Sequence, residues 1–286
     1  MRHGFLLIDK PTGPTSHGVV SQIRRSLHEP SVGHLGTLDP AASGLLVLAI
    51  GAKALKVIEF FQDLSKEYEA SIRFGAVSST YDREGAIEAV KPKPGWQVPD
   101  ELKLRRIIED RLTGDIAQIP PAFSAIHIDG KRAHELARRG NYVHLPARPV
   151  HIEKCDILTY EFPHLSLRIA CGSGTYIRSL AHDLGQLSGF GAYLDNLRRT
   201  RVGGWRIEDA HSPESAAWGD VIPLKDVLSA FNAIEVTDGE EKDIRCGKNI
   251  QREVKAETFA WHDGLPIAVL VPSKDGSRTA HPRKVL

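Results

Sequence analysis

The sequence has few cysteines and no long apolar run. Its three cysteines, Cys155, Cys171 and Cys246, lie far apart and form no CxxC pair, so neither a disulfide framework nor a zinc ribbon is expected. No apolar stretch approaches the roughly twenty residues that span a bilayer, and the apolar segment of MRHGFLLIDKP is too short for a secretory signal. We therefore expect a cytoplasmic protein that does not enter a membrane.

The chain also lacks a strong excess of charge of one sign. Its formal net charge is +1 over 286 residues, which is weak for a nucleic-acid-binding protein when taken globally. Basic residues nevertheless cluster at 131–132, 138–139, 198–201 and 252–255, and acidic residues at 82–88, 208–214 and 238–243. This segregation permits a basic face, although each cluster alone is typical of a solvated surface. The length allows about two domains, and a hydrophobic fraction of 41% is sufficient for sizeable cores.

The stretch from Gly33 to Gly44, GHLGTLDPAASG, combines three glycines with Pro40. Neither a regular helix nor a central strand is expected to run through it. The apolar run LLVLAI follows directly and is typical of a strand covered on both faces. The sequence thus predicts a shaped loop anchored in the core, with Asp39 within it. A carboxylate at this place caps the turn at Pro40, pairs with a cation or takes part in chemistry.

Three other stretches carry candidate functional residues. Lys10 ends a short apolar strand before a turn-rich segment, and a helix capped by Ser16 is expected to follow. Tyr68 lies on one face of an alternating strand that begins at Lys66. Arg178 lies on a helix that follows GSGTY. There its guanidinium either forms a forked pair with a carboxylate or lies on the solvated surface.

These segments together resemble the TruB family of tRNA pseudouridine synthases. GHLGTLDPAASG is similar to the signature loop of that family, LLIDKPTGPTSH to its N-terminal motif, QIPPAFSA to a central block, and GTYIR and NLRR to two later motifs. The resemblance follows the order of the family and covers nearly the whole chain. It implies an isomerase that converts uridine 55 in the T-loop of tRNA to pseudouridine after flipping the base out of the loop.

The resemblance assigns catalytic roles to residues at matching positions. Asp39 is implied to be the nucleophile and Arg178 the cation that pairs with it. Asp82, in the Thr-x-Asp turn, is implied to orient Arg178. Tyr68 is implied to stack on the target base, and it is the candidate base for a ribose C2′ proton.

Four further residues are implied to bind the substrate. Lys10 of the Asp-Lys-Pro motif is expected close to the signature loop, and Leu197 is expected to line the base pocket. Lys56 matches a phosphate contact, with one extra residue after Gly51. His34 is expected to take the place of the extruded nucleotide, with a simple loop histidine as the alternative.

The chain departs from the family pattern at several positions. Phe123, His127 and His134 stand where Tyr, Lys and Tyr are usual, and Ser78 and Ser79 stand where a Thr-Asp pair is common. Five histidines between positions 127 and 164 match no metal-ligand spacing. We expect neither a metal nor a cofactor.

The resemblance also implies the architecture. It predicts an α+β fold with a mixed, mostly antiparallel central sheet and flanking helices. Residues 1–232 would form the catalytic domain, with an RNA-binding insertion at 76–150, and residues 233–286 a small β-rich PUA-like RNA-binding domain. The expected partner is the T-arm stem-loop of tRNA, without a guide RNA, and the expected state is a monomer. An RNA-binding or RNA-folding module and a guide-RNA-dependent relative stay open as alternatives.

Overall fold

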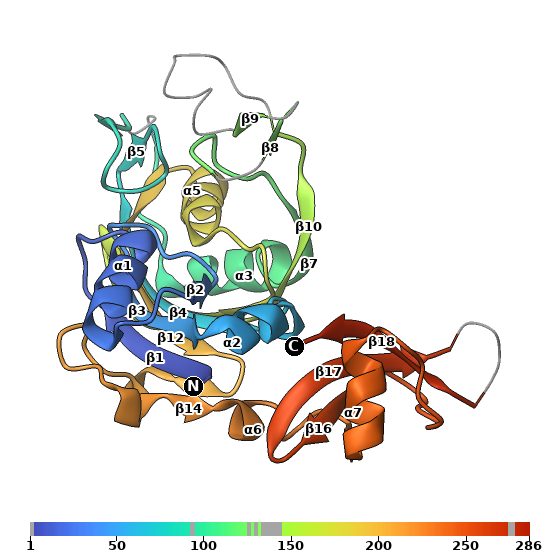
Figure 1. Ribbon diagram of the computed structural model, residues 1–286. Helices are drawn as coiled ribbons and strands as arrows, with labels where there is room; N and C mark the ends of the chain where they lie inside the picture. The colour runs from blue at the N-terminus through green and yellow to red at the C-terminus, as the bar shows by residue number, and fades with distance from the viewer. Residues whose placement is uncertain (1–2, 92–94, 125–126, 129–130, 133–144, 274–277) are drawn as a thin grey trace.

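The computed structural model describes residues 3–91, 95–124, 127–128, 131–132, 145–273 and 278–286. A ten-stranded sheet forms its main body (Figure 1). Eight strands follow one another in the order β14 (Ile222–Pro223), β1 (Gly4–Lys10), β3 (Ser43–Ile50), β12 (Ala192–Val202), β4 (Lys66–Phe74), β11 (His164–Cys171), β10 (Arg148–Glu161) and β7 (Gly114–Gln118). The short strands β2 (Val32–Leu35) and β13 (Trp205–Arg206) pair with β3 and β12.

The pairing of this sheet is mostly antiparallel. In the described part of the chain, β3 and β12 are its one parallel pair, whereas all its other pairings are antiparallel. The helical segments are α1 (Ser16–Leu27), α2 (Ala52–Val57), η1 (Ile58–Phe61), α3 (Glu101–Arg111), α5 (Ile177–Ser188), η2 (Ile207–Asp209), η3 (Trp218–Asp220), α6 (Leu224–Val227) and α7 (Asp238–Arg245). The predicted α+β fold is therefore confirmed.

Strand β3 is buried on both faces, as its apolar run predicts. Its even-numbered residues from Leu46 to Ile50 belong to one hydrophobic cluster, together with the inner face of α1. The intervening residues from Leu45 to Ala49 belong to a second cluster on the opposite face. This division follows from the period of two along a strand. The strand that supports the Asp39 segment is thus held from both sides.

Helix α1 begins one residue earlier than the predicted cap implies. Thr15 is the N-cap, and its side chain accepts a hydrogen bond from the Gly18 amide. Ser16 is already helical, and its buried hydroxyl instead contacts the backbone of Leu38. The expected Ser16 cap is wrong because the Ser16 side chain forms a long-range bond and leaves the cap to the preceding threonine.

A second sheet lies at the C-terminal end, in the order β15 (Ala233–Glu235), β16 (Thr258–His262), β17 (Leu265–Pro272) and β18 (Ala280–Val285). It packs against the large sheet, because Phe259 and Val269 belong to the same hydrophobic cluster as Phe5 and Val47. Two ion pairs also join the sheets' elements, since Glu59 lies 3.0 Å from Arg283 and 2.8 Å from Lys284. The two sheets therefore share one core.

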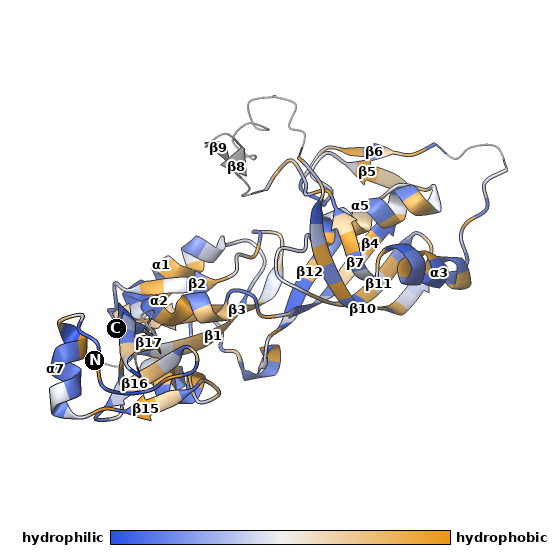
Figure 2. Ribbon diagram, turned by 90° about the vertical axis from the view of Figure 1, so that its right-hand side faces the viewer, coloured by the Kyte–Doolittle hydropathy of each residue, from blue (hydrophilic) through white to orange (hydrophobic). Residues whose placement is uncertain are grey.

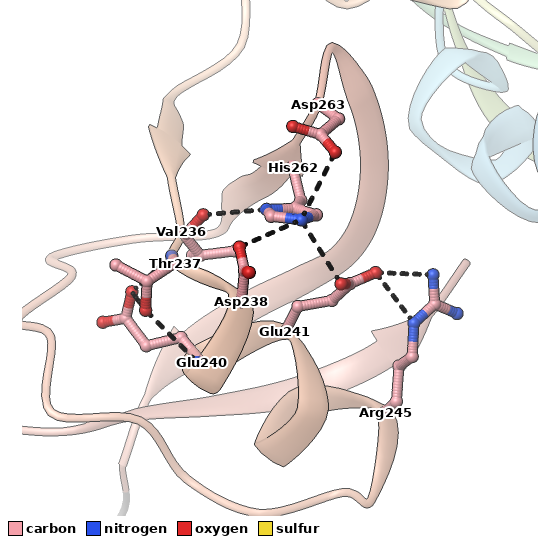
Figure 3. A network of polar contacts seen from close by, with 8 residues as sticks. All are labelled: Val236, Thr237, Asp238, Glu240, Glu241, Arg245, His262 and Asp263. Atoms are coloured by element: carbon pink, nitrogen blue, oxygen red, sulfur yellow. Dashed lines mark hydrogen bonds and ion pairs between the residues drawn. The ribbon is translucent and has the colours of Figure 1, made fainter.

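Helix α7 is attached to the C-terminal sheet by a polar network (Figure 3). Thr237 and Glu240 form a capping box at its start. The Nδ1 atom of His262 lies 3.1 Å from the Val236 carbonyl, and its Nε2 atom faces the carboxylates of Glu241 at 3.4 Å, Asp263 at 3.6 Å and Asp238 at 3.7 Å. The bond to Val236, followed by these negative charges, raises the pKa of His262.

Two short ribbons complete the described structure. One pairs β5 (Ala76–Ser78) with β6 (Ile87–Ala89), and the other pairs β8 (His127–Ile128) with β9 (Lys131–Arg132). Figure 2 shows that α3 and β10 lie at the opposite end of the molecule from β15, β16 and α7. No described helix is both long enough and apolar enough to span a bilayer.

Candidate active site

The loop that carries Asp39 is shorter than predicted. Strand β2 continues to Leu35 and β3 begins at Ser43, so residues 36–42 form the loop, here called the Asp39 loop. Strand β2 reaches into the glycine-rich stretch as an edge strand, because in the described structure it pairs with β3 alone. Gly44 allows β12 to approach closely, because a Cβ at Gly44 would lie 2.3 Å from the Arg199 carbonyl oxygen and its φ is +102°.

The side chains of Lys10 and Ser16 bond to the backbone of the Asp39 loop. The fully buried Lys10 ammonium donates to the carbonyls of Ala42 at 2.7 Å, Pro11 at 3.0 Å and Pro40 at 3.5 Å. Burial lowers the pKa of Lys10, and the charge of Asp39 opposes this shift. The structure therefore places Lys10 next to the loop, as predicted, but with its amine on backbone carbonyls.

Arg178 connects the Asp39 loop with the turn that carries Asp82. On the first turn of α5, its Nη2 atom lies 3.1 Å from Asp39 Oδ2 and its Nη1 atom 3.3 Å from Asp82 Oδ2. The guanidinium also donates to the carbonyls of Thr80 and Phe123. The side chains of Arg178 and Asp82 are 11% and 10% exposed, whereas that of Asp39 is 47% exposed. A fixed cation thus holds a carboxylate that remains open to solvent.

The Asp82 turn is itself fixed on α5. The Asp82 carboxylate accepts hydrogen bonds from the Thr80 hydroxyl and from the Glu84 amide, the latter at 3.0 Å. Between them Tyr81, whose φ is +66°, stacks on His182 of α5 with ring centroids 3.9 Å apart. Because His182 follows Arg178 by one helical turn, the stack places the turn and the arginine on the same helix face.

A cavity of about 760 Å³ opens beside the Asp39–Arg178 pair, within the size range of small-molecule sites. The predicted residues Asp39, Tyr68, Asp82, Arg178 and Leu197 all line it. Tyr68 is 8% exposed, and burial raises the pKa of its phenol. The structure therefore brings together five of the eight residues that the sequence analysis selected.

The other three residues lie outside the cavity lining. Lys10 is buried under the Asp39 loop, as described above. His34 lies on β2, half-buried, and burial lowers its pKa. Lys56, on α2, directs its Nζ atom to the Val285 carbonyl at 3.0 Å, and its own carbonyl accepts a bond from Lys284. Lys56 thus lies at the junction with the C-terminal sheet.

The sequence analysis missed several cavity residues, among them two cations and a tyrosine. Arg199 and Lys66 are almost fully buried, at 1% and 9% exposed, and both line the cavity with Tyr176. Arg199 adjoins Leu197 in the quoted NLRR stretch, and Lys66 and Tyr176 lie in motifs that were selected for a neighbouring residue. Alternation along a strand does not reveal that a charged side chain is buried, so a single sequence gives no sign of Arg199 or Lys66 in the cavity.

Of the departures from the family pattern, one lies at this cavity and the others lie elsewhere in the described structure or outside the described residues. Phe123 lines the cavity and supplies a carbonyl to Arg178. Ser78 and Ser79 bond within the Asp82 turn, to Thr80 and to the Ala86 amide. His127 lies in β8, and His134 lies outside the described residues. No group of three or more metal-ligating side chains occurs among the described residues.

Comparisons with known proteins point to one family. A family model described as TruB family pseudouridylate synthase (N terminal domain) matches residues 24–177. Three proteins named tRNA pseudouridine synthase B are similar to this chain. That of Corynebacterium aurimucosum is 42% identical over 98% of this chain and 95% of its own. That of Leifsonia xyli is 40% identical over 94% and 89%, and that of Mycobacterium leprae is 44% identical over 75% and 68%.

Solved structures share the fold. A chain of a Cbf5-Nop10-Gar1 complex superposes with a TM-score of 0.69 at 23% identity, over 99% of this chain and 84% of that chain. A chain of an H/ACA RNP bound to a substrate RNA containing 2′-deoxyuridine gives 0.68 at 21% identity, with the same coverage. At these identities the likeness concerns the fold alone.

The fold and the match to a synthase family define an isomerase that makes pseudouridine. Two findings identify the family within that class. The family model matches more than half of the chain, and the 42% identical relative aligns with 98% of it. The chain belongs to the TruB family of pseudouridylate synthases.

Proposed function

We propose that this enzyme converts uridine 55 in the T-loop of tRNA to pseudouridine, with Asp39 as the nucleophile. The observation that carries the proposal is the forked contact of Arg178 with Asp39 and Asp82 at the edge of a cavity that also contains Tyr68. The tRNA substrate rests on the names of the 40–44% identical relatives. We also propose that the enzyme acts in the cytoplasm, which agrees with a tRNA substrate.

The reaction moves the ribose C1′ bond from N1 to C5 of the same base. The half-exposed Asp39 carboxylate attacks C1′, as glycosidase carboxylates do, and the sugar is held while the uracil turns. Arg178 keeps the attacking oxygen in place with a positive charge 3.1 Å away, and Asp82 fixes the other side of the guanidinium. Tyr68 is the candidate base of a glycal-type step, in which it takes the C2′ proton as Asp39 leaves C1′ and returns the proton to C2′ as C5 bonds to C1′.

The target uridine must leave the loop stack before Asp39 reaches C1′. The 760 Å³ cavity offers room for one flipped nucleotide, Tyr68 offers an aromatic face and Leu197 an apolar contact. His34, on the β2 side of the Asp39 loop, remains our candidate to fill the gap that the flipped nucleotide leaves. Lys10 acts indirectly, because it fixes the loop carbonyls.

The remaining assignments concern the RNA outside the pocket. We propose that residues 1–232 form the catalytic domain, that the part between 76 and 150 contacts RNA, and that residues 233–286 form a PUA-like RNA-binding domain. The basic segment near Arg252 and the interface lysine Lys56 lie in or beside this C-terminal part. The enzyme acts as a monomer without a guide RNA, metal or cofactor.

The test is to map pseudouridine in an unmodified T-arm stem-loop after incubation with the pure protein in excess EDTA. We expect only the uridine at position 55 to be converted. Asp39→Asn is expected to bind the same RNA without forming pseudouridine. Product formation by Asp39→Asn, with deamidation excluded, would refute the nucleophile. Dependence on added guide RNA and proteins, or on a metal ion, would refute the stand-alone enzyme.

A further inference from the structure

Two buried cations in the cavity have no acidic partner among the described residues. Arg199 donates from Nε to the Leu45 carbonyl at 2.7 Å and from Nη2 to the Gly36 carbonyl at 3.1 Å, and Lys66 donates to the Leu64 carbonyl at 2.7 Å. Within the residues that the structure describes, no carboxylate lies within ion-pair distance of either side chain. Arg178, in the same cavity, contacts two carboxylates.

An unpaired cation that is this deeply buried is unfavourable unless another group supplies negative charge. Arg199 is 1% exposed and Lys66 9% exposed, yet both line the cavity. They also lie close together, since a Cβ on Gly36 would be 3.5 Å from Arg199 Nη1 and 3.7 Å from Lys66 Cε. We therefore expect an anionic group to bind at the cavity wall that Arg199 and Lys66 form.

The position of the wall identifies the group. Arg199 of β12 is directly opposite Tyr68 of β4, so the two side chains share a face of the sheet. Lys66 precedes Tyr68 by two residues on the same strand and lies on that face too. A base stacked on Tyr68 thus has both cations near its edge. RNA phosphates are expected at the solvent-exposed rim, away from side chains that are this buried.

The proposed reaction generates an anion at this place. When Asp39 forms its bond to C1′, the electron pair of the C1′–N1 bond moves to the uracil, which becomes an anion delocalised over N1 and its carbonyl oxygens. The anion later bonds to C1′ through C5, and the Asp39 carboxylate leaves C1′. The C5 proton is then lost and N1 is protonated, so that no net charge or oxidant is required.

We propose that Arg199, with Lys66 beside it, is a catalytic residue that stabilises the negative charge of the detached uracil. This inference rests on the proposed function and adds a role that Arg178 does not fill, because Asp82 still matches the charge of Arg178 after Asp39 has bonded to C1′. Arg199 also holds the start of the Asp39 loop through Gly36, so that the cation and the nucleophile are fixed by one strand.

The experiment compares Arg199→Met with the wild type in single turnovers at saturating T-arm stem-loop. Loss of one preorganised electrostatic group predicts a rate about 10²–10³-fold lower, with little change in RNA affinity. Replacing the target by 5-fluorouridine makes the base a more stable anion, because fluorine withdraws electrons. The defect, measured as conversion of the target nucleoside, should then shrink at least about tenfold, in line with the electrostatic cause.

Arg198→Met is the matched control, because Arg198 is the neighbouring arginine but pairs with Asp9 at 2.8 Å and is 38% exposed. It should react like the wild type with both RNAs. An equal Arg199→Met defect with both bases would overturn the proposal. So would an unchanged saturated rate with weaker binding and a shallower salt dependence, which indicates a phosphate contact.

A second variant covers the case in which Arg199→Met does not fold. Lys66→Met removes one carbonyl contact and should show a smaller defect that also shrinks with 5-fluorouridine; a defect independent of the base would again overturn the proposal. Absence of product from the wild-type protein would refute the proposed function instead. The two failures are therefore distinguishable.

Discussion

Removing the Arg178 guanidinium should separate its structural from its catalytic contribution. In Arg178→Met, the buried Asp82 carboxylate loses a cation 3.3 Å away, which at an effective dielectric constant of about 20 is an attraction of about 5 kcal/mol. Desolvation offsets part of this, and breaking such a pair lowers the free energy of unfolding by about 3–5 kcal/mol. The contact with half-exposed Asp39 adds at most about 1 kcal/mol.

The double variant Arg178→Met/Asp82→Asn should recover much of that stability. The amide removes the unpaired buried charge and retains the shape of the turn, so the free energy of unfolding from urea titration should rise relative to the single variant. Pseudouridine formation should stay about 10²–10³-fold below the wild type, because the cation that holds Asp39 is still absent. Stability and activity are thus expected to diverge.

Arg168→Met provides the control, since Arg168 pairs with Glu69 at 2.9 Å on an exposed part of the sheet. It should change the free energy of unfolding by about 0.2–1 kcal/mol and leave the rate unchanged. A double variant as unstable as Arg178→Met would show that the Asp82 charge is not the source of the loss. A double variant with restored turnover would show that Asp39 does not need the cation.

Three further outcomes are expected. Tyr68→Phe should retain RNA binding and lose rate, because stacking survives without the hydroxyl; equal losses in both would assign the hydroxyl a structural role. Deleting residues 234–286 should lower the melting temperature and cause aggregation, because Phe5 and Val47 would lose the apolar cover of Phe259 and Val269; an unchanged melting temperature would contradict the shared core. Because the pKa of His262 is raised on folding, its contribution should be complete below its unfolded pKa of about 6.5 and lost as pH rises through the folded value. His262→Gln should therefore reduce stability more at acidic than at alkaline pH, and a pH-independent difference would contradict that.

The sequence predicts the fold class and the residues around the Asp39–Arg178 pair, but it predicts poorly what long side chains contact. Asp39, Asp82 and Arg178 are short or forked groups at fixed places on a loop, a turn and a helix start, so their neighbours follow from the backbone. Lys10 and Lys56 carry flexible stems, and each ends on carbonyls that tertiary packing supplies.

Arg199 illustrates the other limit. Alternation along β12 indicates which residues share a face, but it does not reveal that one arginine is buried between β3 and β4 while its neighbour Arg198 pairs with Asp9 in partial contact with solvent. The Ser16 hydroxyl is similar, because its partner Leu38 lies 22 residues further along the chain. Such contacts depend on the assembled sheet and not on local propensity.

The core shared by the two sheets makes the separation between the cavity and the C-terminal sheet a fixed length. Phe259 and Val269 join the apolar cluster of β1 and β3, and Glu59 ties β18 to the helical segment after β3. An RNA that engages both parts must therefore present its target uridine at one set distance from its second contact. Adding or removing a base pair between those two points would move the uridine out of reach of Asp39, whatever its surrounding sequence. If the C-terminal sheet binds RNA as proposed, the fold is expected to select substrates by arm length as well as by the nucleotide in the cavity.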